Sequence, residues 1–233
     1  IYLNAGVVTT LSGLKENKHI LLNNIGAAKS RLLKDPHIKA VSIKRIYPDR
    51  IQIAITERKR VAEIVSAGGM IVIDENGYVL DINPSYDTTD LLLIYGMGTV
   101  GYQIGQTIAD GGELRAGALV SILNELNSYN LLDQMHVLDV SNALSIKLEA
   151  KNGLTIMVGQ MSGIDQKFCS LPSVLENLTQ KNTTTGVLYL LSSGKHVYSP
   201  AAETAPNNNN TGNTDDDPAD DTDKPDTPGT QNG

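Results

Sequence analysis

Residues 36–62 read PHIKAVSIKRIYPDRIQIAITERKRVA, and this stretch decides the fold of the first part of the chain. Apolar and polar residues alternate on both sides of the segment 47–50, Tyr-Pro-Asp-Arg, whose composition is typical of a turn. The alternation predicts one strand over 38–45, with a slip near Ala40, and a second strand over 51–57. We therefore expect an antiparallel pair joined at the turn.

Upstream of this pair the apolar residues recur at helical spacing. Residues 4–12 and 17–34 are each predicted to form a helix. The second helix is expected to end at Asp35-Pro36, because the residue before a proline is pushed out of the helical region. Two helices followed by a hairpin predict a small α+β unit over residues 1–66.

Residues 67–200 form a second unit that we expect to consist mostly of strands. A hairpin is predicted at Met70–Asp74 and Tyr78–Ile82, since Asn76-Gly77 is a strong turn signal. One helix is expected over 113–129 and another over 163–180, which should start late or kink because it contains Pro172. The remaining predicted strands are 137–140, 144–150, 154–159 and a last strand over Val187–Leu191 that resumes, after Ser192-Ser193-Gly194, at Lys195–Tyr198.

Charge divides the chain into three parts. Residues 1–66 carry 12 Lys and Arg against 5 Asp and Glu, whereas residues 67–200 carry 6 against 13. Residues 201–233 carry 1 against 8 and are rich in Asn, Thr, Asp, Pro and Gly. Such a composition buries too little apolar surface to offset backbone entropy, so we predict a disordered acidic tail.

The segment Gly96–Gly101 matches the spacing G-x-G-x-x-G of a dinucleotide site. In such a site the third glycine opens a helix, whose N-terminus meets the pyrophosphate. Here Gly101 is followed by Tyr102 to Gln106 with another glycine at 105, and the position 20 residues beyond it is Ser121. We therefore interpret the segment as a loop and expect no cofactor.

Catalytic and metal-binding patterns find no support in the sequence. The four histidines, at positions 19, 37, 136 and 196, lie far apart and have no C-x-x-C partner. Cys169, the one cysteine, lies in a predicted apolar helix and is expected to be buried as a small hydrophobic residue. A triad assembled from distant residues stays open, but we predict that the protein is not an enzyme.

The basic first unit has two interpretations. Nucleic acid would be expected to meet aromatic residues among the charges, but none interleave with Arg58-Lys59-Arg60, and the rest of the chain is acidic. A basic face next to an anionic membrane surface explains the charge more simply. We therefore expect no nucleic-acid partner.

The stretch 36–62 closely resembles the end of the POTRA domain in FtsQ/DivIB cell-division proteins. That pattern consists of a proline, an alternating strand, Arg-x-x-Pro, a second strand, then Glu-Arg and Ala. The matching positions are Pro36, Ile38, Val41, Ile43, Arg45, Tyr47, Pro48, Ile51, Ile53, Ile55, Glu57, Arg58 and Ala62. A looser similarity extends to about residue 200, through Ile73-Asp74, Leu93–Gly105 and Gly186–Pro200.

The resemblance implies a POTRA domain over 1–66, with two helices and a mixed sheet whose first strand is represented only by Ile1-Tyr2-Leu3. It also implies a mostly-β domain over 67–200 and a tail outside the family over 201–233. Family members are single-pass membrane proteins, so an apolar helix is expected before Ile1, with this region extracytoplasmic at the division septum. The closing strand reads Leu188-Tyr189-Leu190, where many relatives carry Ile-Asp-Leu.

The implied function is that of a non-enzymatic scaffold of the divisome whose partners are FtsL-type and DivIC/FtsB-type proteins. An alternating strand at a sheet edge offers backbone groups that a partner strand can complete. The predicted partner-binding residues on the last strand are Val187, Tyr189, Leu191, Ser193 and Tyr198. An edge protected by the chain's own tail is one alternative; a POTRA-type docking or chaperone module of an export system is another.

Overall fold

The computed structural model describes residues 3–86, 89–98, 101–108, 114–181, 183 and 185–200. The predicted disorder of residues 201–233 lies outside the described residues. Among the described helices, none is both long and apolar enough to cross a bilayer.

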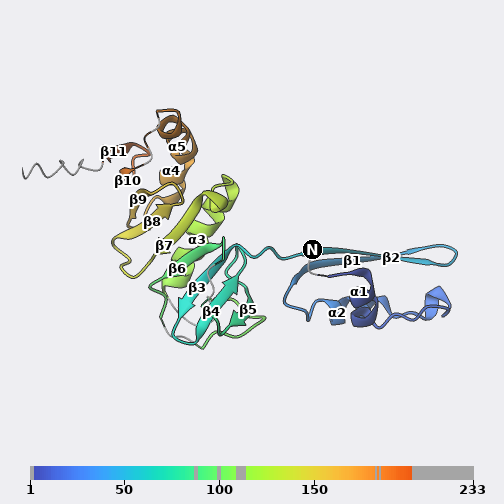
Figure 1. Ribbon diagram of the computed structural model, residues 1–233. Helices are drawn as coiled ribbons and strands as arrows, with labels where there is room; N and C mark the ends of the chain where they lie inside the picture. The colour runs from blue at the N-terminus through green and yellow to red at the C-terminus, as the bar shows by residue number, and fades with distance from the viewer. Residues whose placement is uncertain are drawn as a thin grey trace, which may run out of the picture. The chain divides into compact units, whose positions relative to one another are not determined.

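The first unit contains two helices and an antiparallel strand pair (Figure 1). Its elements are α1 (Ala5–Ser12), the 3-10 turn η1 (Ile20–Leu22), α2 (Ile25–Leu32), β1 (Ile38–Ile46) and β2 (Arg50–Glu57). The register of the pair shifts between Ile38 and Ala40, which confirms the predicted slip. A mixed sheet was expected in this unit. Within the described residues the sheet contains only β1 and β2, which are antiparallel.

The prediction of one helix over 17–34 was wrong. The helical spacing was real only from Ile25 onward, because Asn24 caps α2 by accepting a hydrogen bond from the Ala27 N–H at 3.0 Å. Asn23 is buried and exchanges side-chain hydrogen bonds with the backbone of Lys15, which holds residues 15–23 in a loop. Two consecutive asparagines thus end the loop and start the helix.

The core of the first unit lies between the helices and one face of the strand pair. Leu32, Ile38 and Val41 are buried together with Leu3. Half-buried residues of α1 and of both strands, Val8, Leu11, Ile43, Ile53 and Ile55, complete this cluster. The alternation seen in the sequence therefore separates a face toward α1 and α2 from a face toward solvent.

The second unit is built on one sheet of nine strands in the order β11-β10-β9-β8-β7-β6-β3-β4-β5. The strands are β3 (Ala62–Ser66), β4 (Gly69–Ile73), β5 (Val79–Asn83), β6 (Leu92–Tyr95), β7 (Met135–Asp139), β8 (Ile146–Ala150), β9 (Leu154–Gly159), β10 (Gly186–Leu190) and β11 (His196–Pro200). The helices are α3 (Leu114–Ser128), the 3-10 turn η3 (Leu132–Gln134), α4 (Ile164–Cys169) and α5 (Leu171–Gln180). β2 and β3 belong to different sheets, so the chain passes from the first sheet to the second between Glu57 and Ala62. The predicted boundary was residue 66.

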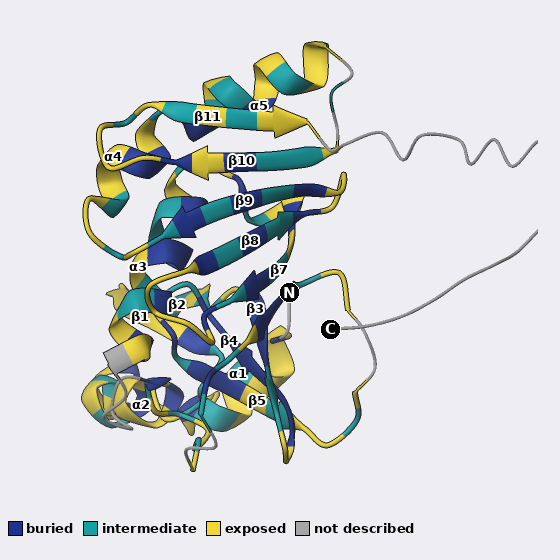
Figure 2. Cartoon of the chain, turned by 90° about the vertical axis from the view of Figure 1, so that its left-hand side faces the viewer, coloured by how far each residue is buried: buried dark blue, intermediate teal, exposed yellow. Residues whose placement is uncertain are grey.

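Apolar residues of the three helices and of alternate strand positions form one large core. Leu119, Ile122, Leu123 and Leu126 of α3 are fully buried in it, as is Phe168 of α4. Figure 2 shows the buried positions running through the central strands, whereas the outermost strand β11 carries partly buried and exposed ones. A sheet this large thus leaves one of its end strands at the surface.

Two predictions concern the region around Pro172. The helix over 163–180 is broken between Cys169 and Leu171, and Pro172 lies in the first turn of α5, where a proline costs no hydrogen bond. The prediction that Cys169 is buried was wrong. Its thiol is exposed and lies 3.2 Å from the carbonyl oxygen of Gln166, because the break in the helix turns this position outward.

Candidate partner-binding edge

The strand β11 lies at one end of the nine-stranded sheet, and within the described residues it pairs only with β10. In an antiparallel pair only alternate residues direct their N–H and C=O groups to the neighbour, so the others present these groups outward. Pro200, the last residue of β11, has no N–H and limits how far another strand can pair. The edge therefore offers a short row of backbone groups.

The last strand predicted from the sequence is in fact a hairpin, which corrects the single-strand interpretation. Tyr189 pairs with Val197 and Leu188 with Tyr198, and the turn between them is closed by a hydrogen bond from the Gly194 N–H to the Leu191 carbonyl. β10 is enclosed, since it pairs with β9 on its other side. Of the two strands of this hairpin, only β11 has an edge that pairs with no other described strand.

The five predicted partner-binding residues divide between the two faces and the turn. Val187 and Tyr189 of β10 lie on the outward face, with Tyr189 43% exposed, and Leu191 follows them at 42%. Ser193 is exposed in the turn. Tyr198 lies on the inward face, where its ring packs against the core and its hydroxyl donates a hydrogen bond to the Thr185 carbonyl.

Val197 also belongs to the outward face, although it is not among the five residues predicted from the sequence. Its side chain is 52% exposed, more than that of Tyr189 opposite it. Val197 lies an even number of positions from Val187, Tyr189 and Leu191, so a strand period of two places it, and not Tyr198, on their face. The antiparallel register of the hairpin keeps this alternation, because Tyr189 pairs with Val197 and Leu188 with Tyr198.

A serine and a histidine fasten the hairpin to the helices. Ser170, between α4 and α5, donates its hydroxyl hydrogen to the Gly194 carbonyl at 3.0 Å and lies 2.7 Å from His196 Nε2. Burial lowers the pKa of His196, and a backbone contact at Lys195 only partly offsets this. The pair thus acts as a clip that joins the loop between α4 and α5 to the hairpin.

A buried lysine anchors α4 to the end of β9. The ammonium of Lys167 donates to the Val158 carbonyl at 2.9 Å and also to that of Gln160. Burial lowers the pKa of Lys167. The contact satisfies carbonyl groups where β9 ends and so fixes the helix that carries Ser170.

At the opposite end of the sheet, the chain itself covers the start of β5. The Val79 N–H donates to the Gln106 carbonyl at 2.9 Å, and the Gly105 N–H donates to the Val79 carbonyl at 3.0 Å. Tyr78 and Thr107 form a further antiparallel bridge. The backbone groups of Tyr78 and Val79 therefore bond within the chain, in contrast to those on the outer edge of β11.

The POTRA-motif residues hold the first unit together. Arg45 donates to the backbone carbonyls of Ile20 and Asn23, at 3.3 and 2.9 Å, and so ties the η1 loop to the hairpin. Pro48 lies in the turn between β1 and β2, and Pro36 in the turn before β1. Glu57 accepts a hydrogen bond from the Leu3 N–H at 3.2 Å.

Arg58 makes the most buried ion pair of this region. Its Nη1 lies 2.7 Å from the carboxylate of Asp74, whose side chain is fully buried, and its guanidinium stacks 3.7 Å from the centre of the Tyr78 ring. The same carboxylate accepts hydrogen bonds from the N–H groups of Asn76 and Tyr78, both at 2.9 Å. The Asp-x-Asn-Gly turn is thus built around a buried charge.

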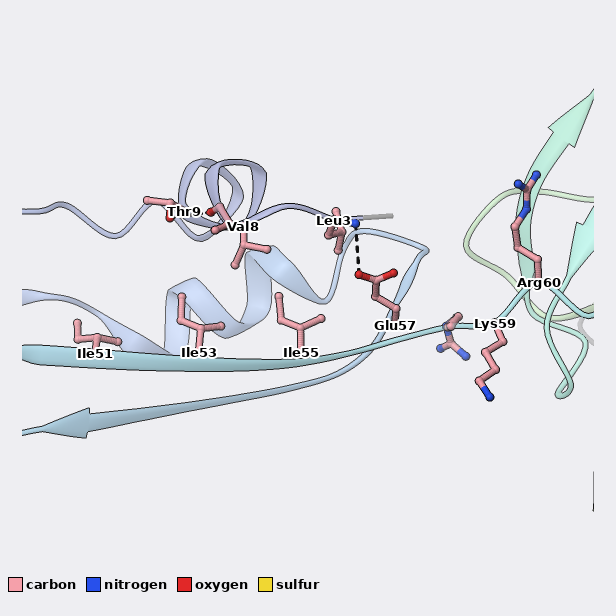
Figure 3. Close-up of a pocket in the computed structure, with 11 residues that line it drawn as sticks. Leu3, Val8, Thr9, Ile51, Ile53, Ile55, Glu57, Lys59 and Arg60 are labelled. Carbon is pink, nitrogen blue, oxygen red and sulfur yellow. Dashed lines mark hydrogen bonds between the residues drawn. The ribbon is translucent and has the colours of Figure 1, made fainter. Parts of the chain in front are cut away.

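An apolar groove of about 970 Å³ runs along the edge of β2 that does not pair with β1 (Figure 3). Ile51, Ile53 and Ile55 point into it from the strand, and Val8 of α1 faces them. Glu57, Lys59 and Arg60 lie at one end. The groove leaves room for a further strand beside β2, which is where the implied first POTRA strand would fit; Ile1 and Tyr2 lie outside the described residues.

In the glycine segment 96–101, Gly96 has a structural role. Gly96 has φ +87°, and a Cβ there would come within 2.1 Å of the Ser141 nitrogen, so this glycine allows two backbones to approach closely. Residues 99 and 100 lie outside the described residues, and no helix begins at Gly101. Within the described residues, no group of three His, Cys, Asp or Glu side chains is placed to hold a metal ion.

Comparison with known families agrees with this architecture. The family model "POTRA domain, FtsQ-type" matches residues 2–58, and the model "Cell division protein FtsQ/DivIB, C-terminal" matches residues 62–190, more than half of the chain. The chain belongs to the FtsQ/DivIB family of cell division proteins. The resemblance drawn from residues 36–62 is thereby confirmed, as is the α+β fold class. The boundary between the two matches falls in the same stretch as the change between the two sheets.

Individual FtsQ/DivIB relatives are distant in sequence. The cell division protein DivIB of Clostridium acetobutylicum is 28% identical over 81% of this chain and 74% of its own length. DivIB of Clostridium tetani is 24% identical, over 70% of this chain and 62% of its own. A solved structure of the major extracytoplasmic domain of DivIB from Geobacillus stearothermophilus, its trans isomer, covers 54% of this chain and 97% of its own, with 13% identity and a TM-score of 0.34.

Proposed function

We propose that this chain is an extracytoplasmic, non-enzymatic scaffold that recruits other division proteins by adding one of their strands to β11. The carrying observation is the difference between the two ends of the sheet. The start of β5 bonds through its backbone to residues 105–107, whereas no described strand pairs with any part of the outer edge of β11. An open edge flanked by exposed apolar side chains favours strand addition.

The side chains next to this edge suit a β-strand partner. Tyr189 and Val197 lie opposite each other on the outward face, and Val187 lies on the same face. Main-chain hydrogen bonds would supply part of the affinity, while these side chains would select alternate residues of the incoming strand. Aromatic residues such as Tyr189 are frequent anchors of protein interfaces.

We further propose that the partners are FtsL-type and DivIC/FtsB-type proteins, as the family membership suggests. These proteins would meet the chain outside the membrane, where an apolar helix preceding Ile1 would anchor it at the septum. A topology reporter fused behind residue 233 of the whole protein tests this arrangement. Reporter activity in the cytoplasm would contradict it.

The binding experiment compares two variants of the purified chain. In the first, Tyr189→Lys and Val197→Lys place two cations on the outward face beside β11. In the second, Ile104→Lys replaces an apolar residue that is 50% exposed in the loop near the covered edge. Capture of a purified FtsL-type and DivIC-type pair is expected to fall at least about tenfold in the first variant and to remain unchanged in the second.

Tyr198 is excluded from this test because its ring packs on the core, so its replacement would disturb the hairpin itself. Circular dichroism confirms that each variant is folded. Undiminished capture by the folded double variant would refute strand addition at β11. Equal loss in both variants would show that the effect is not specific to this edge.

A further inference from the structure

The end of the first unit that carries the β1–β2 turn has a cluster of exposed apolar residues. Leu21 and Leu22 of η1 are 57% and 65% exposed, and Ile46 and Tyr47 at the turn are 43% and 69% exposed. Together we call these four residues the apolar tip. Figure 1 shows η1 and the β1–β2 turn at the same end of this unit, although they are well separated in the sequence.

Two contacts hold the parts of the apolar tip together. Arg45, next to Ile46, donates to the backbone carbonyls of Ile20 and Asn23 on either side of Leu21 and Leu22. In addition, residues 14–18 of the η1 loop and Asp49 of the turn line one cavity of about 230 Å³. Arg45 thus links the η1 loop to the β1–β2 hairpin and holds the four apolar side chains at one end of the unit.

Basic side chains surround the apolar tip. The same two segments, residues 14–23 and 44–50, carry five exposed cations against two exposed acidic residues; the cations are Lys15, Lys18, Lys44, Arg45 and Arg50. The acidic residues are Glu16 and Asp49. Long basic side chains can reach anionic groups while their stems remain on apolar surface.

We propose that the apolar tip inserts into the headgroup region of a membrane that contains anionic lipid. Leucine, isoleucine and tyrosine side chains favour the boundary between headgroups and acyl chains, and tyrosine is enriched at that level. The surrounding cations add electrostatic attraction to anionic headgroups. The tip is formed by a hairpin turn and a short 3-10 turn. It therefore projects from the unit, and lipid headgroups can pack around it.

The charge distribution of the chain gives this contact an orientation. Residues 67–200 carry 13 acidic against 6 basic residues, and residues 201–233 carry 8 against 1. Both segments are repelled by an anionic surface, whereas the tip is attracted to it. The tip shares no residue with the edge proposed for strand addition, so the two proposals are independent.

A fluorescence experiment tests insertion directly, because the chain contains no tryptophan. Tyr47→Trp introduces a single indole at the tip. Leu144→Trp introduces one in the loop between β7 and β8, at a position that is also 69% exposed. With vesicles of phosphatidylcholine and one third phosphatidylglycerol, the emission of the Tyr47→Trp variant is expected to shift to the blue, and that of Leu144→Trp to stay unchanged.

Absence of a shift at Tyr47→Trp, or an equal shift at both positions, would overturn the proposal. The same would follow from an equal shift with vesicles of phosphatidylcholine alone, because the cations would then contribute nothing.

Vesicle sedimentation separates the apolar and charged contributions. Lys18→Glu combined with Lys44→Glu is expected to lower the partition coefficient at least about tenfold at low salt, and added salt should weaken binding of the unaltered chain. Leu22→Ser is expected to lower it less, about threefold. If these variants retain vesicle binding but lose capture of the division partners, the tip is a protein-docking surface and the membrane proposal fails.

Discussion

The two end strands of the nine-stranded sheet differ in how their outer backbone groups are satisfied. Backbone groups at the start of β5 bond to Gly105 and Gln106 of the same chain, and the turn before β5 is built around the buried Asp74. β11 is held from behind by Ser170, while its outer edge pairs with no described strand. An uncovered edge is a hazard for a soluble protein unless it has a use. The difference between the two ends therefore favours β11 as the strand to which a partner would add.

The largest effect is expected at the covered end, from Asp74→Ala. The change leaves the Arg58 guanidinium without its 2.7 Å partner and removes the acceptor of the Asn76 and Tyr78 N–H groups. Breaking a buried ion pair from one side costs about 3–5 kcal/mol of unfolding free energy. Guanidinium denaturation measures it.

Asp81→Ala serves as the control, since this exposed aspartate on β5 accepts a hydrogen bond only from its neighbour Ile82 in the described contacts. A loss of about 0.5 kcal/mol or less is expected there. Similar losses in both variants would show that the turn does not depend on the buried charge.

The next effect tests whether the covering loop protects β5. Gly105→Pro removes the N–H that bonds to Val79 and forces a residue with φ +86° into an incompatible conformation. A loss of about 2 kcal/mol is expected, together with concentration-dependent association through the exposed edge. Sedimentation velocity measures the association.

Gly101→Ala is the matched control, because a Cβ at Gly101 meets nothing within 4 Å. It should remain monomeric and stable under the same conditions. If Gly105→Pro unfolds no more easily than this control and does not associate, the loop is not what protects β5.

A smaller effect is expected at the open end, from Ser170→Ala. The substitution removes the hydrogen bonds to the Gly194 carbonyl and to His196, which join the hairpin to the helices. Hydrogen exchange of the β10 and β11 amides should become faster by an amount equivalent to about 1–2 kcal/mol. Ser173→Ala, at an exposed position of α5, should leave exchange unchanged. Slow exchange in both variants would contradict the clip.

The smallest effect concerns pH. Burial lowers the pKa of His196 below its ordinary value of 6.5, so the unfolded chain binds a proton that the folded chain resists. Stability is therefore complete above pH 6.5 and falls as the pH drops toward the folded pKa. Denaturation at a series of pH values should show a shallower fall between pH 7 and 5 for His196→Asn.

The titration of Asp139 lies below this window. The pKa of Asp139 is lowered by hydrogen bonds from Ser141, and the stability it contributes is lost only as the pH falls below its ordinary 3.8. Identical pH profiles for His196→Asn and the unaltered chain would show that the histidine is not linked to folding.

Much of the fold followed from local patterns. Alternation over 38–57 predicted β1 and β2 and even the slip near Ala40, because the side-chain period of a strand is two. Asn76-Gly77 predicted the β4–β5 turn, since few residues adopt its conformation without strain. Pro172 predicted the break between α4 and α5. These features depend on neighbours in the sequence, which is why the sequence alone determined them.

The candidate site depended on contacts that no local pattern contains. The choice between β10 and β11 as the open strand follows from the order of nine strands, and that order arises when segments far apart pair. The pairing of Val197 with Tyr189 required the chain to reverse at Gly194, and the bonds at the start of β5 required a loop more than twenty residues away. The sequence determined which segments are strands; only the tertiary structure decided which edge stays open, because an edge is defined by the neighbours it lacks.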